Sequence, residues 1–429
     1  MKSSPQSCDT IIIGGGPAGS AAAALLAERG LRVVVLEREK FPRYHIGESL
    51  LPFTCYPLQR LGLLEKMRQS QFVKKYSVQF ISPSGKASQP FYFSTRYEAD
   101  VAQTWQVLRS EFDLMLMQNA RAKGAQVLEE TKVLELIMEE DQTVGVKAQS
   151  KSGELLEFRA PMTLDCSGRE GFAPTRLNWR VREPKLNKVA VWTYYRGAKR
   201  DPGIDEGATT VAYVPDKGWF WYIPQHNQMV SVGVVAEGKY LTRGGVKAPE
   251  AIFKREIEQN LWIKDHLAVG QQTGPYYLTS EYSYHARYCG MEGLLLVGDA
   301  FCFLDPVFSS GLMFALKSGV LAGDTIHEGL VEGDLSPGRF AGYARTLREG
   351  VENMRKLVYA FYEPNFSFRQ ITEKYPELAG EITDCLSGDL NKDFSRLWAA
   401  IEEFVPLPET LPYGAPLAEP NPALAMPGA

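Results

Sequence analysis

The chain has 429 residues, too many for one simple core and suited to two or three subdomains. Hydrophobic residues make up 45% of the sequence and charged residues 23%, so there is enough apolar surface to form a buried core. The net charge of −4 provides no overall field that would attract nucleic acid, and we expect no nucleic-acid partner.

Cysteine and histidine usage argues against a metal centre. The six cysteines and five histidines are scattered, without the spacing of a disulfide framework or a zinc site. The longest apolar stretch, residues 294–316, is interrupted by Asp299, Asp305, a proline and glycines, unlike a membrane span. The N-terminal residues do not follow a signal-peptide pattern. We therefore expect a soluble, cytoplasmic protein with no bound metal.

The N-terminal residues predict a complete βαβ unit. A buried strand over residues 11–13 leads through a glycine-rich turn into an alanine-rich helix over residues 20–29, and a second strand follows over residues 31–36. Such a unit binds a dinucleotide, but by itself it does not distinguish FAD from NAD.

The residues of this turn have separate roles in cofactor binding. Gly14 permits the tight turn and Gly16 lets the backbone approach a pyrophosphate, while Gly19 lets helix and strand pack closely. Glu37, at the end of the second strand, is placed to accept hydrogen bonds from a ribose. The expected cofactor-binding residues in this unit are Gly14, Gly16, Pro17, Ala18, Gly19, Glu37 and Arg38.

A lysine pair interrupts an apolar, strand-like run at residues 72–80. Charges there are typical of an edge strand that avoids aggregation. Because neighbouring side chains of a strand point to opposite faces, at most one of Lys74 and Lys75 can face a given pocket.

Three further strands are predicted at residues 209–214, 219–224 and 229–235. Alternation places Trp219, Trp221 and Ile223 on one face of the middle strand. Core packing is the ordinary explanation for tryptophans in a sheet.

A buried strand that ends in Gly298-Asp299 is followed by the run from Phe303 to Gly311 and then by a helix over residues 312–319. At this helix start the free N–H groups favour an anion, although a serine cap would use the same residues. Beyond residue 348 the pattern predicts helix as far as residue 362 and again over residues 366–401. A proline-rich tail from Pro406 is expected to be extended or disordered and to cover a substrate opening or contact a partner.

The chain resembles the flavoprotein monooxygenase superfamily that includes p-hydroxybenzoate hydroxylase. The resemblance rests on four features in this order: the βαβ unit, Arg109, the strand ending at Gly168 and the Gly298-Asp299 pair. The resemblance implies FAD rather than NAD, with Arg109 and Asp299 contacting the cofactor. It also implies an α/β fold in which a Rossmann-like FAD-binding domain carries an inserted antiparallel β-sheet substrate domain and a short helical C-terminal region.

The expected boundaries follow from this architecture. The FAD-binding domain is expected over residues 1–70, 101–182 and 284–345, the substrate domain over 71–100 and 183–283, and the C-terminal helices and tail over 346–429.

Three motifs narrow the resemblance to the flavin-dependent halogenases. Residues 219–224 match the WxWxIP motif of that family and residues 303–311 match its FxxPxxSxG motif, while residues 46–52 resemble a segment of halogenases that act on phenol- or pyrrole-type substrates, often carrier-tethered. Lys75, three residues after Phe72, falls on the position of the family's lysine.

The chemistry implied by this resemblance uses reduced FAD, supplied by a separate flavin reductase, together with oxygen and chloride or bromide. The halide is oxidised to hypohalous acid beside the flavin and reaches an electron-rich aromatic ring through the catalytic Lys75, as in secondary metabolism. The backbone N–H groups of Ser310 and Gly311 would hold the halide. Pro306 and Gly311 would contact FAD, and the wall and tunnel residues would be Trp219, Trp221, Ile223, Pro224, Phe303 and Ser309.

Alternatives remain within the same superfamily. Geranylgeranyl reductases share the FAD scaffold, the early segment Gly47-Glu48-Ser49 and parts of the aromatic strand. A monooxygenase without halogenating activity, or a flavin-bearing binding or sensor protein without turnover, would also retain the FAD scaffold. No glutamate is found to partner the lysine as in halogenases of free tryptophan, so free tryptophan is disfavoured as a substrate.

Overall fold

The computed structural model describes residues 5–216, 218–280 and 283–418. A six-stranded sheet in the order β20-β21-β12-β2-β3-β8 forms the centre of the cofactor-binding part. Its strands are β2 (Thr10–Ile13), β3 (Val33–Leu36), β8 (Gln126–Leu128), β12 (Met162–Asp165), β20 (Gly290–Met291) and β21 (Leu294–Leu296). All pairs are parallel except that of the short edge strand β20. Parallel strands are covered on both faces, which explains their continuous apolar sequences.

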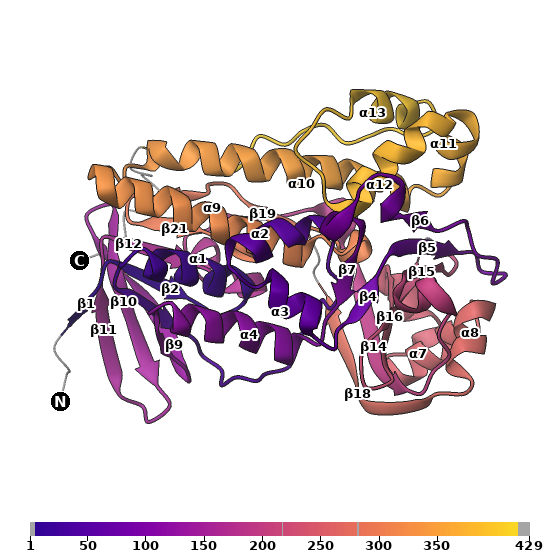
Figure 1. Ribbon diagram of the computed structural model, residues 1–429, viewed down its shortest axis with the longest axis horizontal. Coiled ribbons are helices and arrows are strands. Elements are labelled where there is room, and N and C mark those ends of the chain that lie inside the picture. Colours follow the sequence, from indigo (N-terminus) through magenta and orange to yellow (C-terminus); the bar gives the residue numbers. More distant parts are fainter. Residues whose placement is uncertain (1–4, 217, 281–282, 419–429) are drawn as a thin grey trace.

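Helices cover one face of this sheet and a second sheet covers the other. Helix α1 (Pro17–Glu28) packs between α4 (Arg109–Ala122) and α9 (Gly311–Glu332). On the opposite face a four-stranded sheet contacts β12 through β10, and in Figure 1 it forms one end of the molecule. Its strands are β1 (Gln6–Ser7), β9 (Thr131–Glu139), β10 (Gln142–Ser150) and β11 (Leu155–Arg159).

The part of the chain expected from the sequence to bind the substrate is a seven-stranded sheet, the substrate sheet, in the order β18-β14-β17-β16-β15-β5-β6. Its strands are β5 (Ser77–Ile81), β6 (Phe91–Tyr92), β14 (Val189–Arg196), β15 (Thr209–Tyr213), β16 (Trp219–Pro224), β17 (Met229–Ala236) and β18 (Gln271–Ser280). Every pair is antiparallel except β15 with β5. One face packs against α7 (Pro249–Ile257) and α8 (Leu261–Leu267), while the face that carries Trp219 and Trp221 packs against the C-terminal helices. The fold class predicted from the sequence is confirmed.

Short elements connect these layers. The pair β4 (Val73–Lys75) and β7 (Thr104–Gln106) lies between the two large sheets in Figure 1. A small sheet joins β13 (Arg180–Arg182), β19 (Tyr284–Ala286) and β22 (Cys302–Phe303). The remaining short helices are α2 (Cys55–Arg60), α3 (Leu64–Gln69), α5 (Phe172–Arg176) and α6 (Gly238–Leu241).

The C-terminal region links the two halves of the molecule. Helix α10 (Ala341–Tyr362) runs along the molecule from the cofactor-binding part toward the substrate sheet, where α11 (Phe368–Lys374), α12 (Ala379–Ser387) and α13 (Ser395–Glu402) gather (Figure 1). None of the helices in the described part of the chain is long and apolar enough to cross a membrane.

The described part of the tail is extended and lies along the cofactor-binding part. The Gly414 N–H donates to the Arg287 carbonyl at 2.8 Å, and the Leu417 N–H donates to the Gly290 carbonyl at 2.9 Å. Tyr413 is buried against Phe301, with ring centroids 6.0 Å apart. The tail therefore adds to the core of the cofactor-binding part.

We predict that Tyr413→Ala lowers the free energy of unfolding by about 3 kcal/mol, because it leaves a cavity where a buried ring packed. Urea denaturation followed by circular dichroism measures this. Val331→Ala, at a side chain that is 72% exposed, is the control and should change the stability by less than about 0.5 kcal/mol. Equal stability of the two variants would show that the tail does not dock in solution.

Candidate active site

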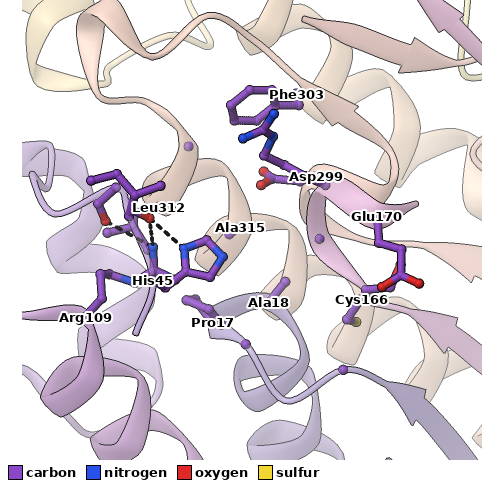
Figure 2. Close-up of a pocket in the computed structure, with 18 of the residues that line it drawn as sticks. Pro17, Ala18, His45, Arg109, Cys166, Glu170, Asp299, Phe303, Leu312 and Ala315 are labelled. Atoms are coloured by element: carbon purple, nitrogen blue, oxygen red, sulfur yellow. Dashed lines mark hydrogen bonds between the residues drawn. The ribbon is translucent and has the colours of Figure 1, made fainter. Parts of the chain in front are cut away.

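One cavity of about 280 Å³ joins the two halves of the molecule. Its wall includes the glycine-rich turn, the loop of residues 43–49, the aromatic strand β16 and the loop that follows β21. Figure 2 shows Pro17 and Ala18 after the turn, His45 of the loop, and Asp299 and Phe303 beyond β21 around one space. The wall includes the following expected site residues: Gly14, Gly16, Pro17, Ala18, Glu37, Arg38, Arg109, Trp219, Trp221, Ile223, Asp299, Phe303, Pro306, Ser309 and Gly311. Four expected site residues are not part of the wall: Gly19, Lys75, Pro224 and Ser310.

The glycine-rich turn fits a pyrophosphate. Gly14 has a φ of 95°, and a side chain there would lie 2.6 Å from the Cys166 carbonyl oxygen. Gly16 is the N-cap of α1, and the N–H groups of the first helical turn have no acceptor within the helix. Gly19 lies inside the helix, where a Cβ atom would approach the Gly14 carbonyl oxygen to 2.0 Å, so its role is in packing.

Glu37 is held in place by the same turn. One of its carboxylate oxygens accepts from the Gly15 N–H at 2.8 Å and the other accepts from the Glu39 N–H at 2.8 Å. The side chain is buried and faces the cavity, in the position expected for binding a ribose. Arg38 forms an ion pair with Glu170, and both residues line the cavity.

Arg109 holds the loop of residues 43–49, which forms part of the cavity wall. Its guanidinium donates to the carbonyls of Ile46 at 2.6 Å and Gly47 at 3.1 Å, as the dashed lines in Figure 2 show. Its other side binds the carboxylate of Asp113 at 2.7 and 2.9 Å. Burial raises the pKa of Asp113, but the charge and hydrogen bonds of Arg109 outweigh it and hold the pKa below its usual value. Arg109 thus shapes the cofactor cavity through the backbone of the loop.

His45 adds a neutral polar group to this wall, and nothing in the sequence pattern pointed to it. The positive charge of Arg109 lowers the pKa of His45 to about 3. Its Nδ1 lies 2.6 Å from the Ile46 carbonyl oxygen, so Nδ1 carries the proton and donates. At neutral pH the imidazole is uncharged.

Two carboxyl groups, those of Asp299 and Asp305, lie on the segment that follows β21. Asp299 lines the cavity, and burial raises its pKa to about 6 against the opposing charges of Arg169 and Arg109. Asp305 does not line the cavity but caps the next short helix by accepting from the Val307 N–H at 3.1 Å. Burial raises its pKa to about 6 as well.

The end of this loop reaches the cavity wall at Ser309 and Gly311. Ser309 adopts a left-handed conformation with a φ of 57°, and Ser310 is the N-cap of the 22-residue helix α9. Gly311 begins that helix, and no atom lies within 4 Å of the position where its Cβ would be. A helix N-terminus next to open space suits a small anion.

Lys75 is fully buried, whereas its neighbour Lys74 is exposed. The amine of Lys75 donates to the Ser49 hydroxyl and to the Leu50 carbonyl, each at 3.0 Å. Burial lowers the pKa of Lys75 to about 7. Because Ser49 lines the cavity and Lys75 does not, the lysine amine lies behind Ser49, one hydrogen bond from the cavity.

The aromatic strand β16 forms the cavity wall on the side of the seven-stranded sheet. Trp219 and Trp221 lie on one face as the alternation predicts, with ring centroids 6.2 Å apart. Trp192 of β14, which is separated from β16 by β17 in the sheet, joins them, with its ring centroid 6.2 Å from that of Trp221. Pro224 pairs with Val230 at the strand end, away from the cavity wall.

Glu48 is a functional candidate that sequence reasoning named only as part of a longer segment. Its side chain is 1% exposed and lines the cavity, and it accepts a hydrogen bond from the Tyr194 hydroxyl at 2.8 Å. Burial raises the pKa of this carboxyl. Among the described residues no group of three or more His, Cys, Asp or Glu is arranged to hold a metal ion.

Comparison with known proteins places this site in a family. A family model described as "FAD binding domain" matches residues 7–334. The chain is 30% identical over 405 residues to the 1H-pyrrole-2-carbonyl-[peptidyl-carrier protein] chlorinase of Pseudomonas fluorescens, with 89% of each chain covered. It is 32% identical over 366 residues to the tryptophan 2-halogenase of Chondromyces crocatus, with 84% of this chain and 69% of that protein covered.

Solved structures give the same result. The flavin-dependent brominase Bmp2 superposes with a TM-score of 0.84 at 28% identity, covering 93% of this chain and 99% of that one. The myxobacterial chondrochloren halogenase CndH superposes with a TM-score of 0.78 at 31% identity, covering 94% of this chain and 98% of that one.

We predict that Glu37→Gln raises the dissociation constant for FAD roughly 10-fold, because a neutral amide accepts weaker hydrogen bonds from a ribose than a carboxylate does. Quenching of flavin fluorescence by the apoprotein measures this constant. Glu28→Gln makes the same change of charge at the far end of α1 and should leave it unchanged. If both variants weaken binding equally, the loss reflects net charge and not a contact from Glu37.

Proposed function

This chain belongs to the flavin-dependent halogenases, and on that premise we propose that it halogenates an electron-rich phenol- or pyrrole-type ring carried on an acyl or peptidyl carrier protein. The enzyme depends on FAD and takes its halogen from chloride or bromide. A reductase or a plain monooxygenase is not favoured, because the two curated relatives described above, which match most of the chain, are halogenases.

The carrier-bound substrate is supported by one relative in particular. The Pseudomonas fluorescens chlorinase acts, by its name, on a pyrrole carbonyl group attached to a peptidyl carrier protein, and it matches this chain along 89% of its length. We further propose that a separate flavin reductase supplies reduced FAD, because the sequence contains a single nucleotide-binding βαβ motif.

FAD, bound in its reduced form, supplies with molecular oxygen the oxidising equivalents that convert chloride or bromide into hypohalous acid. The residues of the cavity fit this cofactor, since the N-terminus of α1 would bind the pyrophosphate and the Glu37 carboxylate would accept hydrogen bonds from the ribose. The N–H groups of Ser310 and Gly311 are proposed to hold the halide at the start of α9.

The observation that carries the proposal is the burial of Lys75 without an acidic partner among its hydrogen bonds. With a pKa of about 7, a large share of this lysine is a neutral amine at neutral pH. A neutral amine is able to react with hypohalous acid, forming an N–halogen bond and releasing water. The halogen then passes to the aromatic carbon, which loses its proton as the amine regains its N–H. Alternatively the amine holds the acid by a hydrogen bond while the ring attacks it.

The tryptophan wall has a separate task in this proposal. Trp219 and Trp221 stand between the FAD cavity and the apolar cluster beneath the C-terminal helices, so they would keep the aromatic substrate away from the flavin. Hypohalous acid is small enough to pass where the substrate is not. Halogenation is thereby separated from direct hydroxylation.

We predict that Lys75→Met abolishes halogenation, with a loss of roughly 100-fold or more, while FAD still binds. Methionine nearly preserves the side-chain volume but has no amine. The measurement is bromination of an electron-rich phenol in the presence of FAD, NADH, a flavin reductase, oxygen and bromide. Lys74→Met is the matched control at the exposed neighbour and should retain activity. Full activity in Lys75→Met would refute the role of this residue.

We predict that halogenation rises as the pH increases through about 7, because the neutral Lys75 amine then replaces the ammonium ion. Since burial lowers this pKa from its unfolded value, the folded state binds fewer protons between pH 7 and the unfolded pKa, and the contribution of Lys75 to stability increases with pH across that window. The pH dependence of kcat/KM at several temperatures measures the titration.

Temperature identifies the titrating group. Asp299 and Asp305 have pKa values of about 6 and would produce a nearby limb in the profile. The ionisation of an amine absorbs much heat, whereas that of a carboxyl absorbs little. A limb that shifts to lower pH on warming belongs to Lys75, and one that stays in place assigns the titration to a carboxyl.

A further inference from the structure

Tyr362, the last residue of α10, connects two motifs that lie far from it in the sequence. Its hydroxyl accepts a hydrogen bond from the indole Nε1 of Trp219 at 2.8 Å. The same hydroxyl donates to the carboxylate Oδ2 of Asp305 at 2.9 Å. Trp219 belongs to the aromatic wall and Asp305 to the loop before α9, and Tyr362 lies beyond residues 7–334, which the FAD-binding family model covers.

The Asp305 end of this bridge controls the loop that faces the cavity. Its side chain is 1% exposed, and its other oxygen accepts from the Val307 N–H at 3.1 Å. Asp305 directly precedes Pro306, which lines the cavity, and the loop continues to Gly311. A buried carboxyl is stable only when both oxygens find donors, so the Tyr362 hydroxyl helps hold the loop in its present form.

The Trp219 end of the bridge orients the aromatic wall. The Trp219 ring is 2% exposed, and a buried indole N–H needs an acceptor, which the Tyr362 hydroxyl provides. The neighbouring Phe361 ring packs edge-on against Trp219 with centroids 6.4 Å apart. The end of α10 therefore contacts the wall and the loop together.

We propose that Tyr362 is a positioning residue for the halogenation, which holds the loop of residues 306–311 in register with the Trp219 wall and so sets the affinity for halide. This inference rests on the proposed function, because it takes that loop as the halide site. It makes a C-terminal helix outside the FAD-binding domain part of the halide-binding machinery, although Tyr362 does not line the cavity.

The test deletes one atom. Tyr362→Phe retains the ring that lies 4.3 Å from the Lys188 amine and 5.2 Å from Phe361, and removes the hydroxyl that bridges the two motifs. We expect the bromide KM to rise roughly 10-fold, the scale of a hydrogen bond to a charged group, with kcat at saturating bromide changed less than about twofold. The bromide dissociation constant of the FAD-bound oxidised protein, read from flavin absorbance, should rise by the same factor, while FAD affinity stays constant.

A matched control lies one turn back on the same helix. The hydroxyl of Tyr359 also donates to a buried carboxylate, but that carboxylate is Glu183, which belongs to neither the loop nor the wall. Tyr359→Phe should lower the melting temperature at least as much as Tyr362→Phe and leave the bromide KM unchanged. A general loosening of α10 would instead raise the bromide KM in both variants, which would overturn the proposal.

The remaining outcomes separate the two hypotheses. If wild type brominates with a saturable dependence on bromide and Tyr362→Phe has the wild-type bromide KM, the inference fails and the proposed function stands. If wild type forms no brominated product, the proposed function fails first. If Tyr362→Phe does not fold, Asp305→Asn tests the same bridge. The substitution replaces one carboxylate oxygen by an NH2 group, so a single oxygen remains to accept from either the Tyr362 hydroxyl or the Val307 N–H. A wild-type bromide KM in that variant would overturn the proposal.

Discussion

The contact of the Arg109 guanidinium with the carbonyls of Ile46 and Gly47 is the interaction on which the rest of the site depends. It fixes the loop that ends in Glu48 and Ser49. The Ser49 hydroxyl lies 3.0 Å from the Lys75 amine and 2.9 Å from the Thr209 hydroxyl of the substrate sheet. One ion pair on α4, Arg109 with Asp113, thus supports a chain of contacts from the cofactor cavity to the lysine and across to the second sheet.

The pKa shifts in this site arise because charged groups are buried without a partner of opposite charge that would cancel the effect of burial. Lys75, Asp299 and Asp305 are all taken out of water, and burial moves the pKa of each toward neutrality. Groups with such pKa values exchange protons readily near pH 7, which suits chemistry that consumes and releases protons. Burying these groups lowers the free energy of unfolding, whereas the two large apolar clusters of the molecule raise it.

The sequence predicted the local parts of the site well. The glycine-rich turn, the strand of Trp219 and Trp221 and the helix start at Gly311 all appear where their patterns indicate, because each depends on a short stretch of chain. The single expected strand over residues 72–80 is divided into β4 and β5 at Tyr76. The four-stranded sheet beside β12 was not anticipated, since its strands have weakly alternating burial and exposed ends.

By itself the sequence determined that a dinucleotide binds at the first βαβ unit, that two tryptophans share a face, and that one lysine at most faces inward. Tertiary structure decided that this lysine is Lys75, because the pairing of β4 with β7 sets which side of the strand is buried. It also decided the partners of Glu48, Lys75 and Tyr362. Those hydrogen bonds join residues 25 to 146 positions apart, and no local pattern carries information about contacts that only the packing of separate segments creates.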